Sequence, residues 1–300
     1  MLLDVRNLRV AFRRDGHEIV PVRDVSFTVP EHGRVALVGE SGCGKSLTAL
    51  SLKRLSPTDR ATVTGTIKAP PRLAYVFQNP SDSLNPVMRI CEQIREALPR
   101  GTERAAQDAQ IVQLLARTGL PDPRRAACAY PCELSGGQQQ RCMIAMALAA
   151  APDLLVADEP TTALDVTTQK QVLELIDSLA AETGMAVLLI THSLGLVAGR
   201  MDFVNVMYAG QIVEAGPVTE VLAAPRHPYT KGLLAAVPAL DAPRDAPLAD
   251  IPGTVPPPDR WPSGCAFAPR CVQATEACTQ GQPPVTAAGS RCWRCFLKGS

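Results

Sequence analysis

The stretch Gly39-Glu-Ser-Gly-Cys-Gly-Lys45-Ser46 fits the pattern G-x-x-x-x-G-K-[ST]. A short apolar run, residues 34–38, precedes it, and residues 47–53 follow with helix-like spacing. In such a strand–loop–helix setting, glycines let successive backbone amides turn toward a di- or triphosphate, and the helix N-terminus adds partial positive charge. Lys45 can then reach the phosphates, and the Ser46 hydroxyl can bind Mg²⁺. The stretch predicts a nucleotide-binding loop.

Composition limits the class of protein. The chain has 300 residues, 46% of them hydrophobic, which is enough for one large domain and a smaller appendix. A net charge of +1 and an aromatic content of 4% argue against a nucleic acid as the main partner. The N-terminus lacks a secretory pattern, and the longest apolar run, residues 142–152, is shorter than the roughly 20 residues that span a bilayer. We therefore expect a soluble, cytoplasmic chain that reaches a membrane only through a partner.

The order of the patterns predicts an α/β architecture. Residues 2–30 alternate apolar and polar side chains as antiparallel strands do, and residues 61–77 hold another short strand pair. Residues 88–150 have helical patterns, whereas residues 153–157 and 185–190 are short apolar runs typical of buried parallel strands. Strands that alternate with helices predict a parallel sheet.

Polar residues follow the predicted strands at the edge where such sheets bind ligands. Gln78 follows one strand, Asp158 and Glu159 follow the next, and His192 follows a third. Asp158 suits Mg²⁺, directly or through water, and Glu159 can orient and deprotonate an attacking water. His192 could bind the γ-phosphate, and Gln78 could contact both metal and water.

A second glycine pair opens a predicted helix at residues 134–141, Leu-Ser-Gly-Gly-Gln-Gln-Gln-Arg. The Ser135 hydroxyl and the amides of Gly136 and Gly137 form a second candidate anion site. Since the first loop already binds one set of phosphates, this site is explained if it closes over the nucleotide of another subunit. We therefore expect a head-to-tail dimer with two ATP molecules between the chains.

Together these motifs resemble an ATP-binding-cassette ATPase over residues 2–225. The corresponding segments are Walker A (39–46), the Q-loop (Gln78), the signature (134–138), Walker B (154–159), the D-loop (163–165) and the switch His192. The resemblance implies catalytic roles for Glu159, His192 and Gln78, and Mg²⁺ ligation by Ser46, Gln78 and Asp158. It implies that ATP is bound by Phe12 (stacking on adenine), Gly39, Glu40, Ser41, Gly42, Cys43, Gly44, Lys45, Ser46, Thr48, Gln78, Asp158, Ser135, Gly136, Gly137 and Gln138.

Finer motifs resemble the oligopeptide/dipeptide importer branch of that family. They are the segments 76–80, 83–86, 165–169, 207–216 and 227–234. This resemblance implies a paralogous ATPase as heterodimer partner, two permease subunits, an extracytoplasmic solute-binding protein, and a place on the cytoplasmic face of the membrane. The alternatives are a nickel or metallophore importer with the same signatures, an exporter, a soluble cassette protein without a permease, and a regulatory module that binds ATP.

Five of the ten cysteines lie in the last 36 residues. Gathered thiolates suit Zn²⁺ or an iron–sulfur cluster, although the paired spacing of ordinary zinc sites is absent. The context of residues 264–271 resembles the extension of importer ATPases, several of which carry a four-iron–four-sulfur cluster. The candidate ligands are Cys265, Cys271, Cys278 and Cys292, with Cys295 as an alternative to Cys292. The other interpretations are zinc, and unliganded thiols or a redox disulfide.

The expected fold is therefore a P-loop nucleotide hydrolase core with an N-terminal antiparallel β subdomain and an inserted helical subdomain at about 82–150. This nucleotide-binding domain covers residues 1–238. Residues 239–300 form a Pro-rich linker and an irregular Cys-rich C-terminal extension.

Overall fold

The structure is a computed structural model that describes residues 1–14, 16–55, 61–99, 101, 103–162, 164–237 and 250–297. The chain forms two compact units, one of residues 1–69 and 189–300 and one of residues 70–188. The predicted domain boundary at 238/239 lies outside the described residues. Among the described helices, none combines the length and apolar character needed to cross a membrane.

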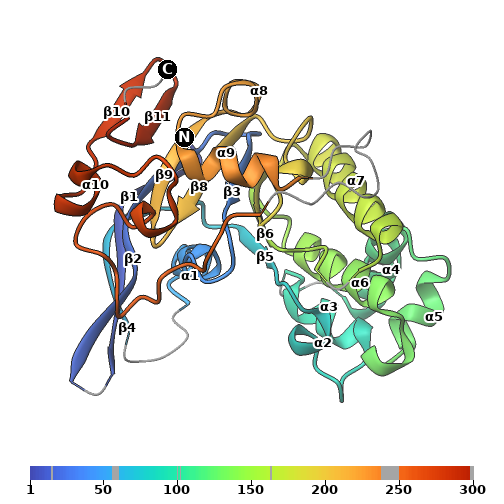
Figure 1. Ribbon diagram of the computed structural model, residues 1–300. Helices are drawn as coiled ribbons and strands as arrows, with labels where there is room; N and C mark the ends of the chain where they lie inside the picture. The colour runs from blue at the N-terminus through green and yellow to red at the C-terminus, as the bar shows by residue number, and fades with distance from the viewer. Residues whose placement is uncertain are drawn as a thin grey trace. The chain divides into compact units, whose positions relative to one another are not determined.

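The first unit is built on a mixed sheet (Figure 1). Its strands run in the order β4-β1-β2-β9-β8-β3. Their bounds are β1 (Leu3–Arg14), β2 (His17–Val29), β3 (Arg34–Val38), β4 (Ala61–Lys68), β8 (Phe203–Tyr208) and β9 (Gln211–Pro217). The predicted antiparallel strands in residues 2–30 are confirmed, since β1 pairs antiparallel with β2 and with β4. β3 and β8 pair in parallel, whereas β8 and β9 are antiparallel.

The phosphate loop lies between a buried strand and a short helix of this unit. All but the first residue of β3 are buried, which fits its continuous apolar sequence. Helix α1 (Lys45–Ser51) begins at the lysine of the motif. The remaining short helices of this unit are α8 (Val218–Ala223), α9 (Pro228–Ala235) and α10 (Glu276–Gln280).

The C-terminal extension contains regular structure that its Pro-rich sequence does not predict. β10 (Val285–Ala288) and β11 (Arg291–Arg294) form an antiparallel hairpin, and β11 continues onto β9 through the pairs Cys292–Ala215 and Trp293–Glu214. The prediction of an irregular tail is therefore wrong for this part. Trp293 is buried, and Arg291 forms an ion pair with the fully buried Glu214, so a few side chains attach the hairpin.

The second unit combines two parallel strands with helices (Figure 1). β5 (Leu73–Val76) pairs with β6 (Leu154–Asp158). The helices are α2 (Pro80–Ser83), α3 (Ile90–Ala97), α4 (Arg104–Arg117), α5 (Pro123–Cys128), α6 (Gly136–Ala149) and α7 (Val166–Thr183), with a 3-10 turn at Pro131–Glu133. β7 (Ala186–Thr191) carries the chain from this unit back into the first.

Two strands that are neighbours in the sequence, β4 and β5, pair with different partners. Residues 61–77 form β4 and β5, but β4 pairs with β1 and β5 pairs with β6. They are therefore not a hairpin, because each strand finds its partner far away in the sequence.

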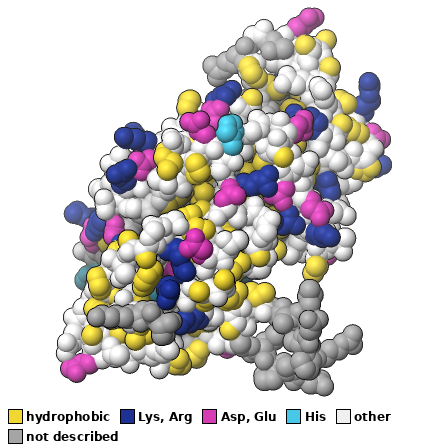
Figure 2. All heavy atoms as spheres, turned by 90° about the horizontal axis from the view of Figure 1, so that it is seen from above, with side chains coloured by type: hydrophobic (Ala, Val, Ile, Leu, Met, Phe, Trp, Pro, Cys, Tyr) yellow, Lys and Arg dark blue, Asp and Glu magenta, His cyan; other side chains and the backbone are white. Residues whose placement is uncertain are grey.

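Figure 2 shows Lys and Arg side chains interspersed with Asp and Glu on one face of the molecule, without a large area of one sign.

Candidate functional site

Two glycines of the phosphate loop, Gly39 and Gly44, lie where any other residue would clash with the backbone. A Cβ atom on Gly39 would lie 2.1 Å from the carbonyl oxygen of Met207 in β8. Gly44 has a φ of 101°, and a Cβ there would lie 2.9 Å from the carbonyl oxygen of Pro21. The loop therefore packs on its own sheet at both ends, which leaves Ser41 and Gly42 exposed between them.

Lys45 lies across this loop. Its side chain is buried, and Nζ donates to the carbonyl oxygens of Gly39 at 2.7 Å and Glu40 at 3.1 Å. No side chain caps the start of α1, so its first amides and the ammonium group can serve an anion together. This cradle fits a nucleotide phosphate.

Three other predicted loop residues differ in exposure. Ser46 is exposed, whereas Thr48 is fully buried and its hydroxyl donates to the carbonyl oxygen of Gly44 at 2.9 Å. Cys43 is also buried, and burial raises the pKa of its thiol to about 11, so the thiol stays protonated. Only the backbone of Cys43 could therefore reach a phosphate.

The second unit brings Gln78 to Glu159. Gln78 Nε2 and Thr162 Oγ1 both donate to Oε2 of Glu159, at 3.3 and 3.0 Å. Glu159 follows the buried Asp158 at the end of β6 and has a φ of 45°, in the left-handed region that a non-glycine residue rarely adopts. Such backbone strain persists where the surroundings hold a side chain in one functional orientation. Thr162 is a contact that the sequence did not single out.

The signature segment opens helix α6 as predicted. Ser135 caps the helix: its hydroxyl accepts from the Gln138 amide at 3.4 Å, and the Gln138 side chain accepts from the Ser135 amide at 3.0 Å. Ser135 and Gly136 are exposed, and a Cβ on Gly137 would lie 3.1 Å from the Thr168 side chain. The exposed helix start is therefore available to a partner.

The remaining predicted nucleotide and D-loop residues lie at strand ends and loops. His192 is exposed directly after β7, and Phe12 is half-buried in β1, where it pairs with Ile19. Asp165 of the D-loop caps α7 by accepting from the amides of Thr167 and Thr168, each at 3.0 Å. Ala163 lies outside the described residues.

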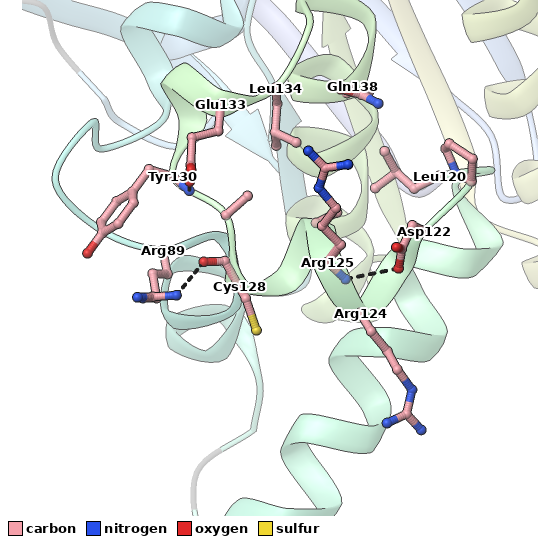
Figure 3. A pocket seen from close by; sticks show the side chains of 13 residues that line it. Arg89, Leu120, Asp122, Arg124, Arg125, Cys128, Tyr130, Glu133, Leu134 and Gln138 are labelled. Carbon is pink, nitrogen blue, oxygen red and sulfur yellow. Dashed lines mark hydrogen bonds between the residues drawn. The ribbon is translucent and has the colours of Figure 1, made fainter.

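A cavity of about 590 Å³ lies in the helical part of the second unit (Figure 3). It is lined by Arg89 and by residues from α5, the following turn and the start of α6. Arg89 donates to the carbonyl oxygen of Cys128 at 2.6 Å and stacks on Tyr130, while the amide of Arg125 donates to Asp122. The walls are therefore a mixture of arginines, carboxylates and one aromatic ring.

Four tail cysteines line one small cavity of about 10 Å³: Cys265, Cys271, Cys278 and Cys295. That volume is about the space of one water. Within the described residues no group of three or more His, Cys, Asp or Glu side chains is arranged to hold a metal ion. Burial raises the pKa of the thiols of Cys265, Cys271 and Cys295 above the ordinary value for cysteine. As arranged here, the four thiols enclose too little space for a four-iron cluster.

Cys292 does not line this cavity, although the structure describes all five tail cysteines. It lies in β11, where its backbone pairs with Ala215. The preference for Cys292 over Cys295 as the fourth member of the set therefore has no support in the geometry. Spacing could not reveal this, because Cys292 belongs to a strand that pairs with β9, far away in the sequence.

Comparison with known proteins assigns the chain to a family. It is 48% identical to a Brucella ovis protein named "Putative peptide import ATP-binding protein", over 98% of this chain and 97% of the relative. A Brucella abortus protein of the same name is 46% identical over 98% and 94%. The chain belongs to the ABC transporter ATP-binding proteins. Family models described as "ABC transporter" and "Oligopeptide/dipeptide transporter, C-terminal region" match residues 22–162 and 213–278.

Solved structures agree on the fold of this ABC ATPase. The ATP-binding cassette MJ0796, in a dimeric post-hydrolysis state bound to ADP and Pi, is 25% identical with a TM-score of 0.62, over 72% of this chain and 98% of that one. CbiO1 from Clostridium perfringens has the same TM-score at 22% identity, over 74% and 90%. The predicted ATP-binding-cassette family, its P-loop fold and its ATPase class are confirmed.

The finer ABC importer motifs, which are far apart in the sequence, meet in one aromatic cluster of the first unit. Tyr208 contacts Tyr229 and Phe267, with ring centroids 4.6 and 5.2 Å apart, and His227 lies 5.8 Å from Phe267. These residues come from the 207–216, 227–234 and 264–271 segments. The Tyr229 hydroxyl accepts a hydrogen bond from the Glu40 amide at 2.8 Å, so the cluster touches the phosphate loop. The sequence offered no role for these side chains.

His227 gives this cluster a pH dependence. It is fully buried, its Nδ1 accepts from the Tyr229 amide at 3.1 Å, and burial lowers its pKa to about 3. The ordinary pKa of histidine is about 6.5, so below that pH the unfolded chain takes up the proton while the folded chain does not. Lowering the pH therefore lowers the free energy of unfolding, by about 2 kcal/mol between pH 7.5 and pH 5. His227→Asn, which keeps an acceptor, should remove that part of the loss in urea unfolding at pH 7.5 and 5. Equal losses in the variant and the wild type would contradict this assignment.

Proposed function

We propose that the chain is the energy-coupling ATPase subunit of a binding-protein-dependent importer of di- or oligopeptides. The observation that carries the proposal is the identity of 48% over 98% of the chain with a relative named for peptide import. The match of residues 213–278 to the oligopeptide/dipeptide C-terminal region supports transport over a soluble cassette protein. The names of these relatives favour peptides over nickel.

In the first unit, Lys45 and the amides at the start of α1 bind the phosphates, and Ser46 offers its hydroxyl to Mg²⁺. The exposed His192 supplies a hydrogen bond to the γ-phosphate, and Phe12 stacks on adenine. Mg²⁺, when bound, neutralises charge that develops on the phosphate oxygens. These roles follow from the family and from a loop whose geometry fits an anion.

In the second unit, Asp158 and Gln78 serve Mg²⁺, and Glu159 takes the proton of the attacking water. The hydrogen bonds from Gln78 and Thr162 hold the Glu159 carboxylate in one orientation, which suits a base that must meet a water. The left-handed φ of Glu159 supports this role.

The exposed start of α6 caps the nucleotide of a second ABC subunit, so that ATP closes a head-to-tail dimer. Ser135, Gly136, Gly137 and Gln138 make this contact, and the second subunit is a paralogous chain. The surface near Gln78 and the helical segment from about 82 to 130 receive a short helix of the permease. The cavity of Figure 3 is lined mostly by residues of this helical segment of the ATPase chain, which supports the role of the segment in docking. The chain is then peripheral to the cytoplasmic face of the membrane.

We keep the tail metal as a proposal with a changed ligand set. Cys265, Cys271, Cys278 and Cys295 line one cavity and are the candidates for a four-iron–four-sulfur cluster, but the loops would have to move apart to admit it. Chain purified without oxygen should then hold about four irons and four acid-labile sulfides. Cys295→Ser should lose them, whereas Cys292→Ser should keep them. Iron-free wild-type chain would reject the cluster, and zinc in its place would support the alternative.

The test of the importer is capture of its partners. Glu159→Gln chain, purified from solubilised membranes in the presence of ATP, should retain two permease subunits, a paralogous ATPase and a solute-binding protein, identified by mass spectrometry. Recovery of soluble partners alone would reject transport and leave the ATPase class intact.

A further inference from the structure

The loop of the C-terminal extension that carries Arg270 lies against the phosphate loop. The Arg270 side chain is 5% exposed and forms a two-pronged ion pair with Glu40, the second residue of the phosphate loop. Nη1 lies 2.5 Å from Oε2, and Nη2 lies 3.0 Å from Oε1. Bidentate pairs of this kind fix geometry as well as charge.

The rest of the guanidinium group is held by the extension and by the aromatic cluster. Nε donates to the carbonyl oxygen of Pro252 at 2.8 Å, and Nη2 donates to that of Ile251 at 3.0 Å. The rings of Tyr208 and Phe267 lie 5.8 and 6.0 Å from its central carbon. The tail therefore fixes the position of the guanidinium group, and the ion pair in turn fixes the position of the Glu40 carboxylate.

Glu40 passes this constraint to the nucleotide site through its backbone. Its carbonyl oxygen accepts from Lys45 Nζ at 3.1 Å, and its amide donates to Tyr229. One residue thus connects the tail cation to the lysine that serves the phosphates. Without Arg270, the partly exposed Glu40 carboxylate would be an uncompensated negative charge in a loop that binds a polyanion, and like charges so close together repel.

We propose that Arg270 is a positioning residue for nucleotide binding: its ion pair with Glu40 holds the phosphate loop and cancels a charge that would repel ATP. The tail thereby sets the affinity of the loop for nucleotide. The proposal rests on the ATPase class of the chain and not on the transported solute.

The test is equilibrium binding of MgADP to the purified full-length chain, by calorimetry. Arg270→Met should raise the Kd about tenfold, as expected for one unscreened like charge near the phosphates. Arg270→Lys, which keeps the charge but not the two-pronged geometry, should lie between. Adding Glu40→Gln to Arg270→Met should bring the Kd back to within about threefold of wild type, because the repelling charge is gone. In the assembled transporter, Arg270→Met should raise KM for ATP with little change in kcat.

Arg294→Met is the matched control. Arg294 is another tail arginine, and its ion pair with Asp24, at 2.5 Å, joins the tail to β2 and not to the phosphate loop. This variant should keep the wild-type Kd for MgADP. A wild-type Kd in Arg270→Met, or a double variant that binds no better than Arg270→Met, would overturn the proposal; the second result would mean that the arginine only stabilises the fold. If Arg270→Met does not fold, Arg270→Lys is measured alone and together with Glu40→Gln, and a wild-type Kd in Arg270→Lys, or a double variant that binds no better than Arg270→Lys, would overturn the proposal. Wild-type chain that binds no MgADP would instead reject the ATPase function itself.

Discussion

Replacing Glu159 with glutamine should lower ATP turnover by about 10²- to 10⁴-fold, the usual contribution of a general base. Glutamine has the same shape, and its carbonyl oxygen can still accept from Gln78 and Thr162, which both donate to Glu159 in the wild type. Nucleotide binding should therefore remain, and the closed dimer should accumulate with ATP. Steady-state phosphate release and size-exclusion chromatography with ATP measure the two effects.

Thr162→Val is the control for that change. It keeps the side-chain shape but removes the hydroxyl that donates to Glu159 at 3.0 Å. Turnover should fall only about tenfold, in keeping with the loss of one hydrogen bond to a charged group. If Glu159→Gln hydrolyses ATP at the wild-type rate, the base is another residue.

Replacing Lys45 with alanine should act on binding itself. The ammonium group is the buried cation of the phosphate loop, and it also bonds the carbonyl oxygens of Gly39 and Glu40. Its loss removes an attraction to the triphosphate and loosens the loop, so the Kd for MgATP should rise about 10²-fold. Calorimetry with the Lys45→Ala and Glu159→Gln variants should separate a defect in binding from a defect in chemistry.

Lys53→Ala is the matched control for Lys45→Ala. Lys53 follows the same helix, α1, and is exposed. Loss of this charge should leave the Kd for MgATP within about twofold of wild type, because exposed charges are screened by salt. Equal losses from both variants would mean that the loop attracts phosphate through its general positive charge and not through Lys45 in particular.

Much of the nucleotide-binding part could be predicted because its signals are local. Gly39, Gly44 and Lys45 stand at set spacings between a strand and a helix, and the helix does begin at Lys45. Ser135 and Gln138 form the helix cap that their spacing indicates. The antiparallel strands of residues 2–30 follow from alternation along a single segment.

Other features depend on pairings across long distances in the chain. Such long-range pairing sets the partners of β4 and β5 and adds β11 to β9. It also explains why Cys295, and not Cys292, lines the tail cavity. Hydrophobic periodicity describes which face of a segment is buried, but not which segment covers it. The left-handed φ of Glu159 was also hidden, since a glutamate carries no sign of the strain that its neighbours impose.

The amino-acid order alone therefore pointed to the phosphate loop, to the acidic pair at the end of β6 and to the family, because each signal lies within a few consecutive residues. The fold decided what those residues touch. It placed Tyr229 and Arg270, 189 and 230 positions away from Glu40, on the same loop residue. Contacts of that separation arise only when the sheet and the tail have packed, since burial and charge pairing select partners by position in space and not by position in the chain.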